Sequence, residues 1–480
     1  MKLNYEQQHA LKVMDSGDNV FLTGGAGTGK TSVLREFIRK HEGRVMVCAL
    51  TGIAAQLLGG TTIHRAFNMP SAACPKAGRK SCKTLEGVDT VIIDEISMTR
   101  MDQFEFVTGI IRNMEKKLKR KIQIIVSGDF FQLPPVLPDD ERKILEEHYG
   151  GPVSRAFAFQ SGMWDECNFR NIVLKKTMRQ DDDGFFGLLS RIRIGDLTAS
   201  DELLSQTHAN LYDPGAVTVC AKNEDAARIN SRSLAALQAS ERSFTILKKG
   251  DIRAKEIVCD ERLILKEGCR VILIANLSAR LVNGMTGTVR SIVHNPFSGR
   301  DDITVSWDKG GQSVITQYTW SVYKYETTGE GDAKKTTRIV CGSYTQIPLK
   351  LAYAVTVHRS QGQTYDAANL LISRTFACGL FYVAVSRVRA IGRLYIDREL
   401  NIDRLADPLV VRFYDELEEE VIPDPAVESD PKKTPSGAVR RGPKSKWNDV
   451  ETTTIRIPRS IKDRVIAEAR RIFEEECVVS

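Results

Sequence analysis

The chain has 480 residues, of which 42% are hydrophobic and 27% are charged, and its formal net charge is +7. At about 150 residues per domain, this length predicts about three domains of ordinary globular composition. No apolar run reaches the roughly 18 residues of a membrane span, and the first residues do not resemble a signal peptide. We therefore expect a cytoplasmic protein without a membrane partner. The ten cysteines form no CxxC pair, which predicts reduced thiols and argues against a structural zinc site.

The first chemically informative segment, Asn19–His41, reads NVFLTGGAGTGKTSVLREFIRKH. A short apolar strand leads into a Gly-rich loop, after which apolar residues repeat at helical spacing. The loop contains GxxxxGKT, a pattern in which backbone N–H groups and the helix dipole hold phosphates, the lysine reaches the terminal phosphates and the threonine ligates magnesium. ATP and Mg²⁺ are therefore the expected cofactors. The expected binding residues are Gly24, Gly25, Ala26, Gly27, Thr28, Gly29, Lys30 and Thr31.

A second apolar strand, DTVIID, ends at the acidic pair Asp94 and Glu95. An aspartate at the end of a strand beside a phosphate-binding loop holds the magnesium ion. Glu95 is then placed to orient and deprotonate the attacking water. An Asp-Glu pair is common in any sequence, so this assignment depends on the Gly-rich loop.

A third apolar strand, IQIIVSG, leads into DFFQLPPV, which contains Gln132. The carboxyl ends of parallel strands form ligand sites, so the ends of the three strands are expected to converge. Each proline pushes the residue before it toward extended geometry, and the double proline therefore holds Gln132 in one pose. This predicts that Gln132 lies near the γ-phosphate of ATP. The alternative is that Gln132 only caps its loop.

These motifs and their order resemble the superfamily 1 DNA helicases of the PIF (petite integration frequency) type and their RecD-like relatives. The resemblance extends from Leu3 to Ile396. It implies an α/β fold with two RecA-like P-loop NTPase domains. LNYEQ resembles the adenine-reading motif, with Gln7 as the base contact, and Gly362 in TVHRSQGQT belongs to the implied nucleotide site.

The resemblance implies two arginine fingers. LKKTMRQ would supply Arg179, and YVAVSRVR would supply Arg387. Such a finger stabilises charge on the transferred phosphoryl group, so both side chains must reach ATP across a cleft from the second domain. Without the resemblance, each would be interpreted as a surface residue. The implied catalytic residues are Lys30, Glu95, Gln132, Arg179 and Arg387.

The implied DNA-binding residues lie in three motifs, TGIAA, the segment from GGTTIH to Pro70, and TVHRSQGQT. The family mostly has lysine where Arg359 stands, a difference that keeps the positive charge. Phe67 either stacks on DNA as part of a wedge or belongs to the core. The full set is Thr51, His64, Phe67, Pro70, Thr356, His358 and Arg359.

The resemblance also predicts domain boundaries. The first RecA-like domain would cover residues 1–178, with a small wedge-type insertion at about 63–88. The second would cover 179–281 and 349–412. Between its two parts, alternating β-type segments predict an SH3-like barrel at 282–348, which either clasps DNA or is purely structural.

The last part of the chain lies outside the resemblance. Residues 413–447 are rich in charge, proline and glycine, which predicts a flexible linker. Residues 448–480 predict a strand and an amphipathic helix that resemble the first half of a ribbon-helix-helix DNA-binding unit. The alternative is a helix docked on another domain or on a second copy.

The expected function is an ATP-dependent DNA helicase, with the 5′-to-3′ polarity that the resemblance implies, acting in DNA repair, recombination or replication. Its expected partners are single-stranded DNA and forked duplex DNA, with the protein working as a monomeric motor. Two alternatives use the same motifs. One is a translocase that remodels complexes without separating strands, and the other is a slow nucleotide switch that binds a protein. The sequence does not distinguish DNA from RNA.

Overall fold

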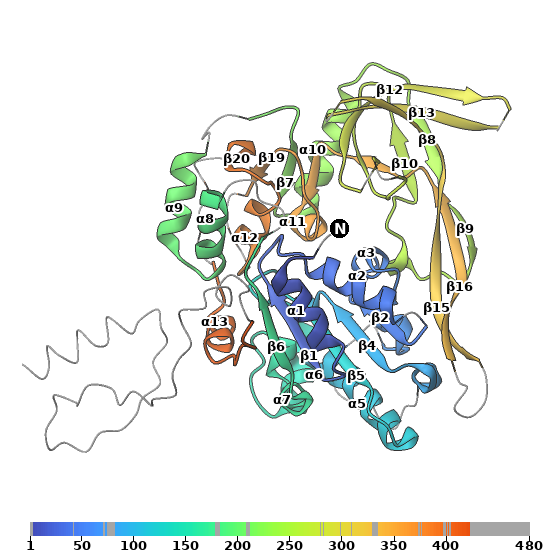
Figure 1. Cartoon of the computed structure of the whole chain (residues 1–480). Coiled ribbons are helices and arrows are strands. Elements are labelled where there is room, and N and C mark those ends of the chain that lie inside the picture. Colours follow the sequence, from blue (N-terminus) through green and yellow to red (C-terminus); the bar gives the residue numbers. More distant parts are fainter. Residues whose placement is uncertain are drawn as a thin grey trace, which may run out of the picture. The chain divides into compact units, whose positions relative to one another are not determined.

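The structure is a computed structural model that describes residues 3–422, except residues 42, 71–72, 74–81, 178–182, 208–211, 279, 282, 298, 309, 329–334, 373–374, 376, 397–399, 401 and 403–404. The chain divides into two compact units, Met1–Val411 with Glu418–Ile422, and Arg412–Leu417 with Pro423–Ser480. Figure 1 shows the helices and strands of the whole chain. The sites described below lie in the first unit. The candidate finger Arg179 and the predicted strand and helix at 448–480 lie outside the described residues.

The first domain contains a six-stranded parallel sheet with the order β3-β2-β4-β5-β1-β6. The three strands that carry the sequence motifs, β4, β5 and β1, are neighbours in this order, so their carboxyl ends lie at one edge. The expected convergence of the three motifs is confirmed. The strands are β1 (Val20–Gly24), β2 (Val45–Ala49), β3 (Thr61–Thr62), β4 (Thr90–Asp94), β5 (Gln123–Gly128) and β6 (Arg170–Leu174).

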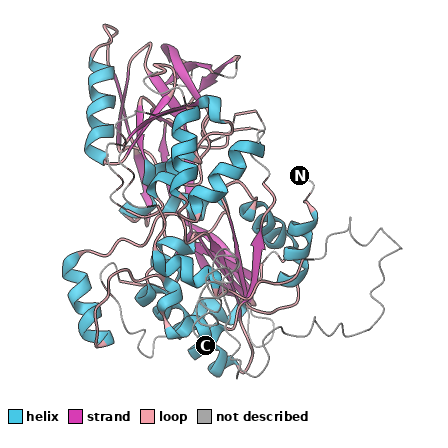
Figure 2. Ribbon diagram, turned by 90° about the vertical axis from the view of Figure 1, so that its left-hand side faces the viewer, coloured by secondary structure: helices cyan, strands magenta, loops and turns pink. Residues whose placement is uncertain are grey.

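Helices cover both faces of this sheet (Figure 2). Successive side chains of β1 point to opposite faces and are all buried, so both faces need a covering layer. Val20 and Leu22 pack in one core cluster with α1 (Tyr5–Met14) and α2 (Lys30–Lys40). Phe21, between them, packs against the Trp164 ring on the opposite face, with ring centroids 5.2 Å apart. The remaining helices of this domain are α3 (Gly52–Leu57), α4 (Ile63–Ala66), α5 (Met101–Leu118), α6 (Asp139–Tyr149) and α7 (Gly162–Cys167), with short 3-10 turns at η1 (Lys83–Gly87), η2 (Ile96–Met98) and η3 (Ala158–Gln160).

The second domain is built on a four-stranded parallel sheet with the order β18-β7-β19-β20. Its core includes Leu133 from the LPP segment that follows β5. A residue that directly precedes the double proline in the first domain therefore packs into the core of the second domain. The elements are β7 (Val217–Cys220), β18 (Ala354–Thr356), β19 (Ala368–Leu371), β20 (Leu394–Ile396), α8 (Asp183–Arg193), α9 (Leu197–Gln206), α10 (Asn223–Ala235), α11 (Val357–Ser360), α12 (Leu380–Val385), η6 (Ile391–Arg393) and α13 (Pro408–Asp415).

Antiparallel sheets interrupt the second domain, with the orders β14-β13-β12-β11-β17, β15-β16-β9 and β10-β8. The predicted start of this region at residue 282 is too late, because β9 pairs with β16 and β11 pairs with β12. β9 and β11, which both precede residue 282, therefore belong to the sheets of this region. The elements are β8 (Arg242–Thr245), β9 (Leu247–Gly250), η4 (Ala254–Glu256), β10 (Arg262–Leu265), β11 (Arg270–Leu273), β12 (Thr286–Asn295), β13 (Arg300–Trp307), β14 (Gln312–Ile315), β15 (Tyr318–Thr328), β16 (Lys335–Gln346) and β17 (Leu349–Leu351).

The acidic segment expected to begin a flexible linker is partly docked. The Glu420 N–H donates to the Asn171 carbonyl on β6 at 2.7 Å. Arg170 pairs with Glu420 at 2.5 Å, and Lys175 pairs with Glu419 at 2.7 Å. Because β6 is an edge strand with unpaired backbone groups and basic side chains, it attracts an acidic segment. The expectation of a linker from residue 413 is therefore wrong for residues 418–422.

Candidate nucleotide and nucleic-acid sites

The Gly-rich loop joins β1 to α2 as predicted. Gly29 precedes α2 with a φ of 85°, and no side chain caps this helix. The first backbone N–H groups of α2 therefore have no side-chain acceptor, which is the arrangement that binds phosphate. The Lys30 Nζ donates to the Gly24 carbonyl at 2.7 Å and to the Gly25 carbonyl at 3.2 Å. Burial lowers the pKa of the Lys30 ammonium, and the Asp129 and Glu95 carboxylates oppose this shift.

Gln7 lies against this loop. Its side-chain Nε2 donates to the Thr28 carbonyl at 3.0 Å, and its Oε1 accepts from the Asn4 N–H at 3.0 Å. Both ends of the amide are therefore engaged, one on the phosphate loop and one on the start of α1. Adenine recognition by Gln7 stays a prediction.

Asp94 is the last residue of β4, and Glu95 follows it directly. Glu95 has a φ of 53°, a left-handed conformation that costs about 1–3 kcal/mol for a non-glycine residue and clusters at functional sites. Burial and the neighbouring Glu95 carboxylate raise the pKa of Asp94 to about 7. A buried aspartate beside a second, half-buried acid fits a divalent cation, whose charge would stabilise the ionised carboxylates.

Gln132 lies where the two domains meet. Its side chain is buried, and its N–H donates to the Asp129 carbonyl at 2.9 Å. Gly379, which precedes α12, has a φ of 74°, and a Cβ on it would lie 2.4 Å from the Gln132 carbonyl oxygen. Only glycine allows so close an approach of the second domain. The backbone at Gln132 is thus pressed against the second domain.

Three side chains of the second domain reach the phosphate site. The Tyr382 hydroxyl accepts from the Ala26 N–H at 2.7 Å. The Arg193 guanidinium donates to both oxygens of Asp129, at 2.8 to 3.1 Å. The Gln361 Nε2 donates to the Glu95 Oε2 at 3.2 Å.

Sequence reasoning assigned no role to these three residues. Tyr382 stands in the motif YVAVSRVR and Gln361 stands in the motif TVHRSQGQT, so both lie close to residues that the sequence already identified as candidates. Arg193 is an ordinary helical arginine, and no pattern in the sequence distinguishes it.

The candidate finger Arg387 is held by backbone carbonyls of its own domain in this structure. Its guanidinium is buried and donates to the carbonyls of Val383 at 2.5 Å, Ser360 at 2.9 Å and Gln363 at 3.0 Å. Gly362 lies between the last two residues, and a Cβ on it would lie 3.9 Å from the Glu95 Oε1. Arg387 therefore holds the segment that faces Glu95.

A cavity of about 550 Å³ lies between α3, α10 and the strand insertion. Its wall combines the aromatic side chains of β15 with cations and amides. Such a mixture suits single-stranded nucleic acid, because aromatic rings stack on bases and cations follow the phosphates. The lining residues that carry this chemistry are Gln56, Asn223, Asn230, Asn276, Tyr318, Trp320, Tyr323, Lys350, Thr356, Arg359 and Gln363.

Two of the predicted DNA contacts, Thr356 and Arg359, line this cavity, which we call the groove. Thr356 is buried, and its hydroxyl oxygen has no hydrogen-bond partner among the described residues. Arg359 is exposed. His358, between them, is partly buried, and burial lowers its pKa.

The other predicted DNA contacts do not line the groove. Phe67 is only 3% exposed, so the structure corrects its expected stacking role in favour of the core alternative. The His64 ring is buried as well, because α4 packs this side of its turn inward. Thr51 caps α3 by accepting from the Ala54 N–H, and Pro70 is exposed.

Comparison with known proteins decides the family. A family model described as PIF1-like helicase matches residues 2–202. The ATP-dependent DNA helicase Pif1 of Bdellovibrio bacteriovorus is 32% identical over 438 residues, which cover 87% of this chain and 93% of that protein. The chain belongs to the PIF1-like helicase family. The resemblance inferred from the motifs is thereby confirmed.

Two solved structures of Pif1 helicases indicate which conformation this PIF1-like chain resembles more. Unliganded Pif1 from Bacteroides sp. matches with a TM-score of 0.74 at 32% identity, over 86% of this chain and 96% of that chain. The Bacteroides Pif1 bound to single-stranded DNA matches with a TM-score of 0.60 at 30% identity, with the same coverage. The structure is therefore more similar to the DNA-free form than to the DNA-bound form. No described helix is long and apolar enough to cross a membrane.

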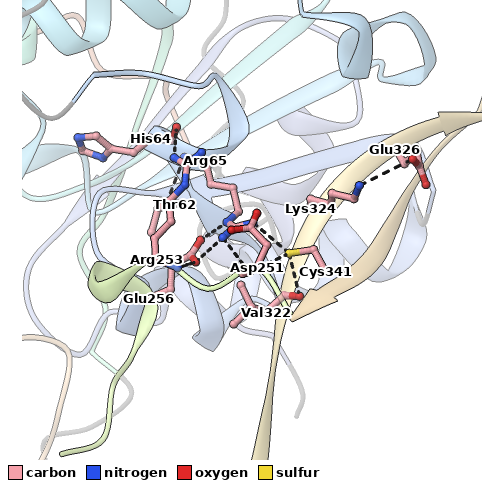
Figure 3. A network of polar contacts seen from close by, with 10 residues as sticks. All are labelled: Thr62, His64, Arg65, Asp251, Arg253, Glu256, Val322, Lys324, Glu326 and Cys341. Carbon is pink, nitrogen blue, oxygen red and sulfur yellow. Dashed lines mark hydrogen bonds and ion pairs between the residues drawn. The ribbon is translucent and has the colours of Figure 1, made fainter. Parts of the chain in front are cut away.

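A polar network joins α4 of this PIF1-like chain to the strand insertion (Figure 3). Arg65 forms a bidentate ion pair with Glu256, and both side chains are almost fully buried. The Arg65 Nη1 also contacts Asp251 at 3.0 Å. From the other side, the Arg253 Nη1 donates to the His64 carbonyl at 3.0 Å. We call this network the α4 clasp, because it ties the first domain to the insertion that forms one wall of the groove.

Arg65→Ala is expected to loosen the insertion from α4 and speed up the binding of single-stranded DNA. Breaking a buried ion pair leaves Glu256 unpaired, which costs about 3–5 kcal/mol when the pair holds a rigid fold. Here the cost of the unpaired Glu256 can be lowered if the insertion separates from α4. The measurement is the association rate of a fluorescent oligonucleotide, together with the melting temperature.

Lys324→Ala is the matched control, because Lys324 pairs with Glu326 on the exposed surface of β15 at 3.9 Å. Such surface pairs contribute about 0–1 kcal/mol, so the control should leave both quantities unchanged. An association rate that is unaltered in Arg65→Ala, at a lower melting temperature, would show that the clasp only stabilises the fold.

Proposed function

We propose that this protein is an ATP-dependent DNA helicase that moves 5′-to-3′ along single-stranded DNA and opens forked duplex DNA, as a monomeric motor. The observation that carries the proposal is the segment 356–363 of the second domain. Arg359 and Gln363 from this segment line the groove, whereas Gln361 donates to Glu95 beside the phosphate loop. One short segment thus faces both sites that a DNA-stimulated motor must couple. The Bacteroides relative bound to single-stranded DNA supports the choice of ligand.

In the proposed nucleotide site, Lys30 and the N–H groups at the start of α2 bind the phosphates of ATP. Thr31 and Asp94 would hold Mg²⁺, which supplies positive charge to the phosphate oxygens when it is bound. Glu95 acts as the general base for the attacking water, supported by its strained backbone and its place beside Asp94.

Arg179 and Arg387 are proposed as the arginine fingers, on the strength of the family motifs. For Arg387 the proposal has a structural requirement. Its guanidinium donates to three carbonyls, and some of these bonds must be exchanged for phosphate when the second domain closes on ATP.

In the proposed DNA site, Lys350 and Arg359 contact phosphates, while the rings of Tyr318, Trp320 and Tyr323 stack on bases. Stacking and phosphate contacts accept any sequence, which suits a motor that moves along DNA. Separating one base-pair step costs on the order of 1.4 kcal/mol, so capture of spontaneously opened pairs suffices for a small motor of this kind.

The test is an unwinding assay with the purified full chain on forks that carry either a 5′ or a 3′ single-stranded tail. We expect ATP-dependent strand separation only with the 5′ tail. DNA-stimulated ATP hydrolysis without separation of any fork would favour a translocase that remodels complexes. Hydrolysis that DNA does not stimulate would favour a nucleotide switch, and stimulation by RNA alone would change the substrate. The cytoplasmic location expected from the sequence stays a prediction.

Gln132→Ala is expected to weaken the coupling between ATP and DNA while ATP still binds. Gln132 is proposed to report the γ-phosphate to the second domain, and its carbonyl lies against Gly379, next to α12. By linkage, ATP and DNA should lose the same factor of effect on each other's affinity. The measurement is the affinity for single-stranded DNA with and without a non-hydrolysable ATP analogue.

Val136→Ala provides the control, because Val136 stands in the same segment and is 62% exposed. It should keep the wild-type change in DNA affinity. If Gln132→Ala keeps that change too, Gln132 only caps its loop.

A further inference from the structure

Gln361 is the one described side chain of segment 356–363 that contacts Glu95. It follows α11 directly and comes from the second domain, whereas Glu95 directly follows β4 of the first domain. Its Nε2 donates to the Glu95 Oε2 at 3.2 Å. A hydrogen bond between a neutral amide and a carboxylate fixes the direction in which that carboxylate points.

The other end of the same amide is also informative. The Gln361 Oε1 is buried and has no hydrogen-bond partner among the described residues. Buried polar groups normally find a partner, and exceptions mark functional positions. An acceptor that belongs to the amide bonded to Glu95 is placed to accept a hydrogen bond from the second O–H of the water that Glu95 activates.

The segment around Gln361 is held as one piece. The Arg387 guanidinium donates to the carbonyls of Ser360 and Gln363, at 2.9 and 3.0 Å, on the two sides of Gln361. The Gln363 side chain accepts from the Tyr365 hydroxyl at 2.7 Å. A shift of the groove-facing residues must therefore move Gln361 as well.

In segment 356–363, residues that line the groove stand before and after the residue that contacts Glu95. Arg359 and Gln363 line the groove on either side of Gln361 in the chain. DNA that engages Arg359 and Gln363 would thus set the position of the Gln361 amide.

We infer that Gln361 is a positioning residue through which DNA bound in the groove orients Glu95 for hydrolysis of ATP. The inference rests on the proposed roles of Glu95 as the base and of the groove as the DNA site. It assigns DNA stimulation of hydrolysis to one hydrogen bond between the two domains. The nucleotide contacts of Lys30 and Thr31 do not depend on this bond, so the effect should fall on kcat and not on the KM for ATP.

The experiment measures ATP hydrolysis by the full chain with and without oligo-deoxythymidine, together with oligonucleotide affinity and melting temperature. For Gln361→Ala we expect the ratio of stimulated to unstimulated kcat to fall by about tenfold or more, within the range that a positioned general base contributes. The KM for ATP and the DNA affinity should stay close to wild type. Gln361→Asn retains the amide but is one methylene shorter, and Gln361→Glu places a carboxylate against Glu95, so both should show the same loss.

Tyr323→Ala is the matched control, because Tyr323 lines the groove from β15 and lies outside segment 356–363. It should lower DNA affinity while the stimulation ratio at saturating DNA is retained. A Gln361→Ala protein that behaves like this control, or that retains the full stimulation ratio, would overturn the inference.

Glu95→Gln in the same assay separates the inference from its premise. If Glu95→Gln hydrolyses ATP at a wild-type rate, the proposed base is wrong and the inference fails with it. If Glu95→Gln is inactive while Gln361→Ala is stimulated normally, the base assignment stands and only the inference is overturned. We expect Glu95→Gln to be inactive and Gln361→Ala to lose specifically the stimulation of ATP hydrolysis by DNA.

Discussion

Lys30→Ala is expected to abolish measurable ATP hydrolysis while binding of single-stranded DNA stays largely intact. Lys30 lies in the phosphate loop, within the field of the Asp129, Glu95 and Asp94 carboxylates. Its ammonium is the cation proposed to neutralise the terminal phosphates of ATP, and no other described residue of the loop is cationic. The measurements are the rate of phosphate release and the affinity for a fluorescent oligonucleotide.

Lys40→Ala is the control for this experiment, since Lys40 ends the same helix and forms an exposed pair with Asp15 at 3.3 Å. It should hydrolyse ATP at the wild-type rate. Substantial hydrolysis by Lys30→Ala would refute the assignment of the phosphate loop. A joint loss of hydrolysis and DNA binding, with a lower melting temperature, would show that Lys30 is needed for folding.

Arg387→Ala should lower kcat by about a thousandfold or more, the size of effect that an arginine finger supplies. The KM for ATP should change less, because a finger acts mainly in the transition state. The structure adds a second consequence. Three carbonyls lose their donor, each at a cost of about 1–3 kcal/mol if it stays buried and unpaired, so the melting temperature should fall as well.

Arg387→Lys separates the two effects, because lysine keeps the charge but lacks the planar fork of donors that spans several carbonyls. A finger role predicts that Arg387→Lys recovers part of kcat, whereas a purely structural role predicts recovery of neither kcat nor stability. Arg389→Ala removes an exposed cation two residues further on and serves as the control. A loss of ATP affinity with unchanged kcat in Arg387→Ala would contradict the finger.

The sequence by itself determined the nucleotide-binding framework and the family. A Gly-rich loop between an apolar strand and an amphipathic segment specifies its own backbone, because glycine conformations and helical periodicity are local properties. The same holds for the strand ends at Asp94 and Gly128. Parallel strands expose their carboxyl ends at one edge, so the convergence of the three motifs followed from local patterns and a general rule of topology.

Only the tertiary structure decided which side chains of the second domain face the phosphate loop and how far the strand insertion extends. Arg193 reaches Asp129 from 64 residues away along the chain, and Tyr382 reaches Ala26 from 356 residues away. Likewise, β9 joins a sheet with β16, about 90 residues further on. Local sequence carries no record of such pairings, because they are fixed by the packing of whole domains and the loops between them. Phe67 illustrates the same limit, since one aromatic residue suits a DNA wedge or a core equally well until its neighbours are known.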